Sequence, residues 1–126
     1  MKDINLILEW ANVTAKTIYH PVPCRGIVHE VNIVCNIELD IDNTVTISRG
    51  TSAVNLVTPA ADNTAAGTVI TGVPDTTYKD LIFDPESATA ANKVLKIAVP
   101  NTIDAACTLG INIKYDDSAA VTQSST

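Results

Sequence analysis

The most regular hydrophobic pattern in the chain lies near its C-terminal end, over residues 107–115. Apolar side chains occupy every second position there, and the positions between them are polar or glycine. The apolar set is Cys107, Leu109, Ile111, Ile113 and Tyr115. Because successive side chains of a β-strand point to opposite faces of a sheet, this period of two predicts a strand with one buried face. The five side chains are therefore predicted to face a core.

Other segments show the same alternation, or a short apolar run bounded by turn-forming residues. They predict strands over 4–10, 27–35, 44–48, 53–57, 68–73 and 94–99. The second of these runs carries apolar residues on both faces toward its end, which is typical of a central strand or of a β-bulge. The third and fourth are joined by a short polar turn, and we expect them to form a hairpin.

Several segments between the runs do not fit a regular element. Residues 11–25 contain Pro21 and Pro23, which excludes a helix interior or a central strand. Residues 84–87 begin with an Asp-Pro pair that is suited to the start of a single helical turn. The uncharged segment 118–126 is expected to be mobile or to be ordered by a partner.

This arrangement predicts an all-β, single-domain antiparallel β-sandwich, Ig-like or jelly-roll-like, with seven or eight short strands. No helical pattern is long enough to connect two parallel strands. The predicted organisation is an N-terminal strand or arm over 1–18, the sandwich over 19–117, and a C-terminal tail over 118–126. The first segment has two possible fates: it adds to the sheet edge of a neighbouring copy, or it folds back as an edge strand of its own sheet.

Composition narrows the range of partners. The chain has 126 residues, of which 46% are hydrophobic and only 4% aromatic, so the core must be mainly aliphatic. Its net charge is −6 and its basic residues are scattered, which argues against a nucleic-acid partner. No apolar run approaches the roughly 20 residues of a membrane helix, and the N-terminus lacks the apolar region of a signal peptide. We therefore expect no membrane partner and synthesis in the cytoplasm.

Residues able to carry out chemistry are few and scattered. The two histidines, His20 and His29, lie in no catalytic motif, and no nucleophile–base pair or pair of carboxylates can be placed. The chain is therefore expected to be a binding or structural protein and not an enzyme.

Metal and disulfide chemistry are also not expected, and we expect no cofactor. Cys24, Cys35 and Cys107 form an odd set without CxxC spacing, which favours small buried side chains over a disulfide framework. A zinc site made by the first two of these with His20 and His29 is a minor alternative, because its spacing matches no known zinc module. A calcium loop over 40–43 is a second minor alternative, because the required Gly and the distal Glu are missing.

Apolar residues near the N-terminus are the candidates for a partner interface. They are Ile4, Leu6, Leu8, Trp10 and Tyr19. Trp is enriched at the centres of interfaces, but Trp10 is equally suited to covering the end of the core, and the sequence leaves both roles open.

Six segments, in order, resemble the capsid decoration (head-stabilising, auxiliary capsid) proteins of tailed bacteriophages. The segments are 21–23, 26–34, 44–48, 65–69, 94–99 and 105–115. Together they span roughly residues 19–116. The family's Asn-Gly after the first long strand is replaced by Asn36-Ile37, and its Gly-Asp before the late strand by Asn92-Lys93, so these two turns depart from the family.

The resemblance implies a structural protein on the outer surface of the virion. Such proteins bind the major capsid protein, bridge neighbouring capsid subunits and are often trimers. The alternative is a carbohydrate-binding or adhesin-like sandwich module of a phage fibre. Sugar-binding faces usually display clustered aromatic residues, whereas the five aromatic residues here are dispersed along the chain, which favours the capsid interpretation.

Overall fold

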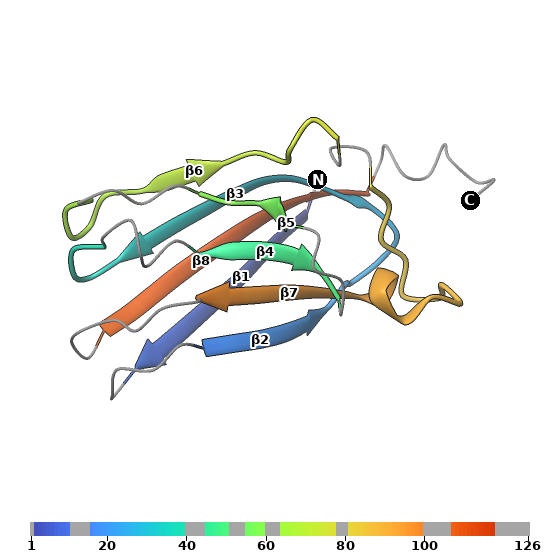
Figure 1. Cartoon of the computed structure of the whole chain (residues 1–126), viewed down its shortest axis with the longest axis horizontal. Helices are drawn as coiled ribbons and strands as arrows, with labels where there is room; N and C mark the ends of the chain where they lie inside the picture. Colours follow the sequence, from blue (N-terminus) through green and yellow to red (C-terminus); the bar gives the residue numbers. More distant parts are fainter. Residues whose placement is uncertain are drawn as a thin grey trace.

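Two antiparallel four-stranded sheets face each other in the computed structural model of the chain (Figure 1). The structure describes residues 2–10, 16–39, 45–50, 55–59, 64–77, 81–99 and 107–117. The predicted all-β sandwich is confirmed.

The first sheet, here called sheet A, has the strand order β1-β8-β3-β6. Its strands are β1 (Lys2–Trp10), β8 (Cys107–Asp116), β3 (Ile27–Cys35) and β6 (Ile70–Gly72). The predicted C-terminal strand is thus central, and it pairs along most of its length with a neighbour on each side. β1 is an edge strand that pairs with β8 of its own chain, which is the second of the two fates considered for residues 1–18.

The second sheet, sheet B, has the order β2-β7-β4-β5. Its strands are β2 (Lys16–Pro21), β7 (Val94–Val99), β4 (Thr46–Arg49) and β5 (Asn55–Val57). The predicted hairpin is confirmed as β4 and β5. The proline-containing β2 lies at the sheet edge, where a missing backbone donor can be tolerated.

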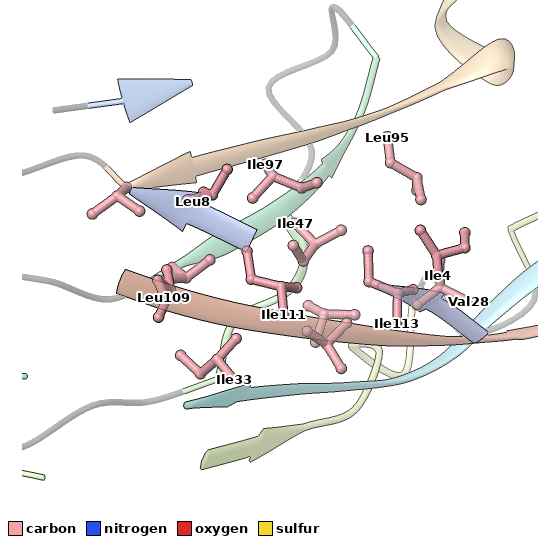
Figure 2. Close-up of a cluster of buried hydrophobic side chains, with 14 of the residues drawn as sticks. Ile4, Leu8, Val28, Ile33, Ile47, Leu95, Ile97, Leu109, Ile111 and Ile113 are labelled. Carbon is pink, nitrogen blue, oxygen red and sulfur yellow. The ribbon is translucent and has the colours of Figure 1, made fainter. Parts of the chain in front are cut away.

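The core lies between the two sheets and is almost entirely aliphatic. Figure 2 shows Ile4 and Leu8 of β1 lying among side chains from both sheets, including Ile47 and Ile97 of sheet B. The predicted inner set of β8 is confirmed, since all five side chains are buried and none is more than 4% exposed. The strict alternation of β8 therefore buries one complete face of the strand.

The structure also shows the two local features predicted for β3 and for residues 84–87. β3 is both a central strand and irregular, because its register with β8 shifts between Val28 and Glu30. Residues 84–87 close one turn, in which the Ser87 amide donates to the Asp84 carbonyl at 3.1 Å, and the 3-10 helix η2 (Ala90–Lys93) follows. The predicted tail over 118–126 lies outside the described residues.

Candidate functional site

Most of the residues predicted to form a partner interface are oriented toward the core. Ile4 and Leu8 are each 7% exposed, and Leu6 is half-buried against the core. In a single chain these side chains cover the inner face of β8 and are not available to a partner. Tyr19 is exposed, but it lies on β2 in the other sheet. The side chain of Trp10 lies outside the described residues, so the structure does not gather these five residues into one exposed surface.

A different surface, the outer face of sheet A, combines exposed apolar and polar groups. Because side chains alternate along each strand, the residues between the buried ones form cross-strand rows on this face. Three rows can be defined from the strand register. The charged row is Asp3, Lys114 and Glu30; the amide row is Asn5, Asn112, Asn32 and Thr71; the apolar row is Ile7, Gly110, Val34 and Val69.

The charged row crosses three strands with alternating sign. Lys114 Nζ lies 2.9 Å from Asp3 Oδ1, and Glu30 is the direct cross-strand neighbour of Lys114 on β3. A hydrogen bond from Lys114, a second from Asn112 and the positive charge of Lys114 together hold the pKa of Asp3 below its ordinary value. Both partners of the ion pair are solvent-exposed, so it orients the side chains and contributes little to stability.

The amide row is connected by hydrogen bonds across all four strands of sheet A. Asn112 Nδ2 donates to Asn5 Oδ1 at 2.8 Å, and Asn32 Nδ2 donates to Asn112 Oδ1 at 3.3 Å. The Thr71 hydroxyl donates to Asn32 Oδ1 at 2.6 Å. Asn32 also donates to a carboxylate oxygen of Glu30 at 3.0 Å, which joins this row to the charged row. The side chains are thus held in fixed positions in front of the sheet.

The apolar row borders a shallow hollow of about 330 Å³. Ile7 is 72% exposed on one side of it and Val69 is 60% exposed on the other. Gly110 lies between them in the central strand and leaves the floor of the hollow without a side chain. Exposed apolar side chains that surround a hollow are typical of a protein contact surface.

The sequence contains one signal for this surface. The alternation that predicts the buried side chains of β8 also assigns Thr108, Gly110, Asn112 and Lys114 to the opposite face. The strands that flank β8 cannot be read from the sequence, however, because β1 and β3 are distant from it in the chain. Only the sheet order brings the members of each row together.

The cysteines and histidines are not gathered into one cluster in the part of the chain that the structure describes. Cys24 is half-buried, Cys35 and Cys107 are buried, and all three are free. Burial and the neighbouring thiol of Cys35 raise the pKa of Cys107 to about 11, so this side chain is a neutral thiol at physiological pH. His20 and His29 do not join the first two cysteines in a zinc site, because the described residues contain no group of three ligating side chains. The candidate calcium loop over 40–43 lies outside the described residues.

Within the described part of the chain, no helix is both long enough and apolar enough to cross a membrane.

Comparisons with known proteins give no relative for this chain. No protein family matches it, and neither a curated protein nor a solved structure is significantly similar to it.

Proposed function

We propose that this chain is a capsid decoration protein that binds the outer surface of a phage head and stabilises it by bridging neighbouring copies of the major capsid protein. The proposal places it on the outside of the virion after synthesis in the host cytoplasm. In this role the protein binds without catalysis and needs no cofactor.

Four of the six segments that carry the resemblance in sequence fall on the central strands of the two sheets. The segments 26–34, 44–48, 94–99 and 105–115 contribute to β3, β4, β7 and β8, which are the four inner strands of the two sheets. The other two segments, 21–23 and 65–69, lie at the end of edge strand β2 and directly before β6. The agreement in the order of the four inner strands is what a shared architecture would produce, and it supports the proposal to that extent.

The single observation that carries a binding role is the outer face of sheet A. Its polar side chains are held by hydrogen bonds, and its apolar side chains remain exposed. A face built on a sheet requires little rearrangement to bind, so little conformational entropy is lost on contact. A capsid offers many equivalent binding positions, and a rigid contact of this kind can be repeated at each of them.

The direct experiment uses capsids assembled from the major capsid protein encoded with this chain, but without the chain itself. The full chain is added, and co-sedimentation, capsid melting temperature and a cryo-EM map are recorded. We expect saturable binding, a higher capsid melting temperature and additional density on the outer surface. An acidic β-sandwich protein of similar size is the control. Binding no stronger than that of the control would overturn the proposal.

The proposal also includes self-association, with a trimer as the expected state. In the trimer, β1 would pair with β8 of a neighbouring copy in the way that it pairs with β8 of its own chain in the single-chain structure. Because Asn5 and Asn112 are direct partners across β1 and β8, an Asn5→Cys/Asn112→Cys double variant reports which chain supplies β1. A disulfide within one chain leaves a single-chain species on a denaturing gel, and exchanged arms give covalent oligomers. Deleting residues 1–10 is a poorer test, because it uncovers the core around Ile4 and Leu8.

A carbohydrate-binding module of a phage fibre is the second candidate, and the amide row is the observation that favours it. Side-chain amides of Asn are suitable partners for sugar hydroxyls. The aromatic platform on which sugar rings usually pack is not present on the outer face of sheet A among the described residues. A glycan array with the full chain separates the candidates: specific glycan binding that Asn32→Ala abolishes, together with no capsid binding, would favour the fibre role.

A further inference from the structure

Gly110 is not required by the fold at its position, and this suggests that something outside the chain requires it. It lies in the middle of central strand β8, where glycine weakens a strand and often marks the close approach of another chain. Its φ is not positive, unlike that of Gly50 and Gly67. A Cβ placed on it would meet Val34 Cγ1 at 3.4 Å, an ordinary van der Waals contact. The hollow above Gly110 is therefore suited to a group from a partner.

We propose that the outer face of sheet A binds the same face of a second copy of the chain. The twofold axis would run parallel to the strands, between β8 and β3. In this arrangement β8 of one copy stacks on β3 of the other, and β1 stacks on β6. The contact is isologous, so every pair of residues in it occurs twice.

Each row then meets the same row of the second copy, and complementary members lie opposite one another where β8 stacks on β3. Lys114 faces Glu30 of the second copy, so that opposite charges meet. Asn112 faces Asn32 of the second copy, and because each of these NH2 groups already donates two hydrogen bonds within its own chain, this pair packs without a new one. Val34 of the second copy lies above Gly110, so an apolar side chain fills the hollow.

The residue pairs nearest to the twofold axis contribute most to the complementarity of the two faces. Two stacked, twisted sheets pack with their strands about 30° apart, so the corners of the face separate while the centre stays in contact. The three pairs between β8 and β3 are central. The exposed Ile7 and Val69 are brought toward one another at the sides.

Other symmetric arrangements match this face less well. A twofold axis that runs across the strands would place the charged row on the apolar row, with Lys114 over Gly110 and Glu30 over Val34. Burying charges without partners is unfavourable. An axis between β1 and β8 would leave β6 and its neighbour Val69 uncovered.

The size of the face sets the strength of the contact. With strands about 4.8 Å apart and rows about 6.7 Å apart, the three rows cover about 400 Å² per copy. The total of about 800 Å² is below the roughly 1,200 Å² of stable interfaces, so single copies would associate only weakly. Where another contact already holds copies together, this contact would strengthen their association through multivalency. The inference goes beyond the proposed function but concerns the same face, so one copy cannot contact a capsid and a second copy through this face at the same time.

The test is sedimentation equilibrium of the full chain over a concentration series. It shows whether two copies of the smallest oligomer associate, and so double its mass, as the concentration rises. Lys114→Glu and Glu30→Lys should each weaken the doubling by about tenfold, and combining them should restore it to within about threefold of the original chain. Lys96→Glu, the same charge reversal on sheet B, should have no effect. Circular dichroism and melting temperature verify folding, because Lys114 also pairs with Asp3.

Gly110→Leu provides a second variant that leaves charge unchanged. It fills the hollow, and we expect it to weaken doubling while the chain stays folded. The inference is overturned if the full chain never doubles, if Lys114→Glu behaves like Lys96→Glu, or if the double variant is not restored. Capsid binding is measured separately, at concentrations below those at which the chain doubles. Doubling without capsid binding then removes only the proposed function, and capsid binding without doubling removes only this inference.

Discussion

The Tyr115 hydroxyl donates a hydrogen bond of 2.7 Å to the backbone carbonyl of Cys24. Tyr115 lies near the end of β8 and is fully buried, whereas Cys24 lies between β2 and β3. This bond joins the segment that crosses from one sheet to the other to the central strand of sheet A. It also supplies the partner that a buried phenol requires.

Removing this hydroxyl should destabilise the chain without changing its fold. Tyr115→Phe is expected to lower the free energy of unfolding by about 1 kcal/mol, because a net hydrogen bond is lost and the Cys24 carbonyl loses its partner. Urea denaturation followed by circular dichroism measures the change. Tyr19→Phe is the matched control, since that side chain is exposed, and its effect should be near zero. An equal loss in both variants would contradict this role of the hydrogen bond.

The aromatic ring of the same residue constrains Gly26. A Cβ on Gly26 would approach Tyr115 Cε2 to 2.5 Å and the Asp116 carbonyl oxygen to 2.8 Å. We expect Gly26→Ala to lower the free energy of unfolding by about 1–3 kcal/mol, as overpacking commonly does.

Gly110→Ala is the opposite case, because its Cβ makes only ordinary contacts. Less conformational freedom in the unfolded chain and better strand formation should stabilise the protein by about 0.5 kcal/mol. Thermal melts of this variant and Gly26→Ala, measured side by side, test both statements. If Gly110→Ala proves as damaging as Gly26→Ala, then Gly110 is required by the fold and the argument for a partner above it is lost.

The core should depend on the inner side chains of β8 far more than on the outer ones of β1. Ile111→Ala removes a side chain that is 2% exposed and is expected to cost about 2–5 kcal/mol, through lost burial and the cavity left behind. Ile7→Ala removes a side chain that is 72% exposed and should change stability by less than about 0.5 kcal/mol. Chemical denaturation of both variants gives the comparison.

Alkaline conditions should weaken the fold through Cys107. Its pKa is raised from 9.0 to about 11 by burial and by the neighbouring Cys35. Because the folded chain holds this proton more tightly than the unfolded chain, the contribution is fully present below pH 9 and is lost as the pH rises toward 11. We expect the loss of stability between these values to be smaller in Cys107→Ala. Denaturation curves at several pH values test this, and an identical pH dependence in both proteins would contradict it.

Much of the fold could be predicted from the sequence because its determinants are local. The alternation over 107–115 specifies both a strand and its buried face, since the side-chain period of a strand is two. Only five residues separate β4 from β5 in the sequence, so their pairing is local as well. The strand β2 is not predicted from the sequence: Pro21 excludes only a central position, and in the structure β2 lies at a sheet edge.

The candidate surface could not be predicted in this way. Whether Ile4 and Leu8 belong to an exposed arm or to the core depends on whether β8 is free to pair with β1, and nothing near either residue in the chain decides this. The amide row likewise requires Asn5 and Asn112 to become cross-strand neighbours. The predicted interface therefore consists mainly of strongly apolar residues. Residues of this kind are also the ones most often buried in a core.

The sequence alone thus determined the class of the fold, the inner face of β8 and the aliphatic character of the core. Tertiary structure decided the order of strands in each sheet, and with it the outer face of sheet A. The physical reason is that a strand's own sequence specifies which of its faces is buried, whereas its neighbours are selected by packing and backbone hydrogen bonding between segments far apart in the chain. Gly110 illustrates this: its place on the outer face follows from alternation, and the hollow above it exists only because Ile7 and Val34 lie on either side.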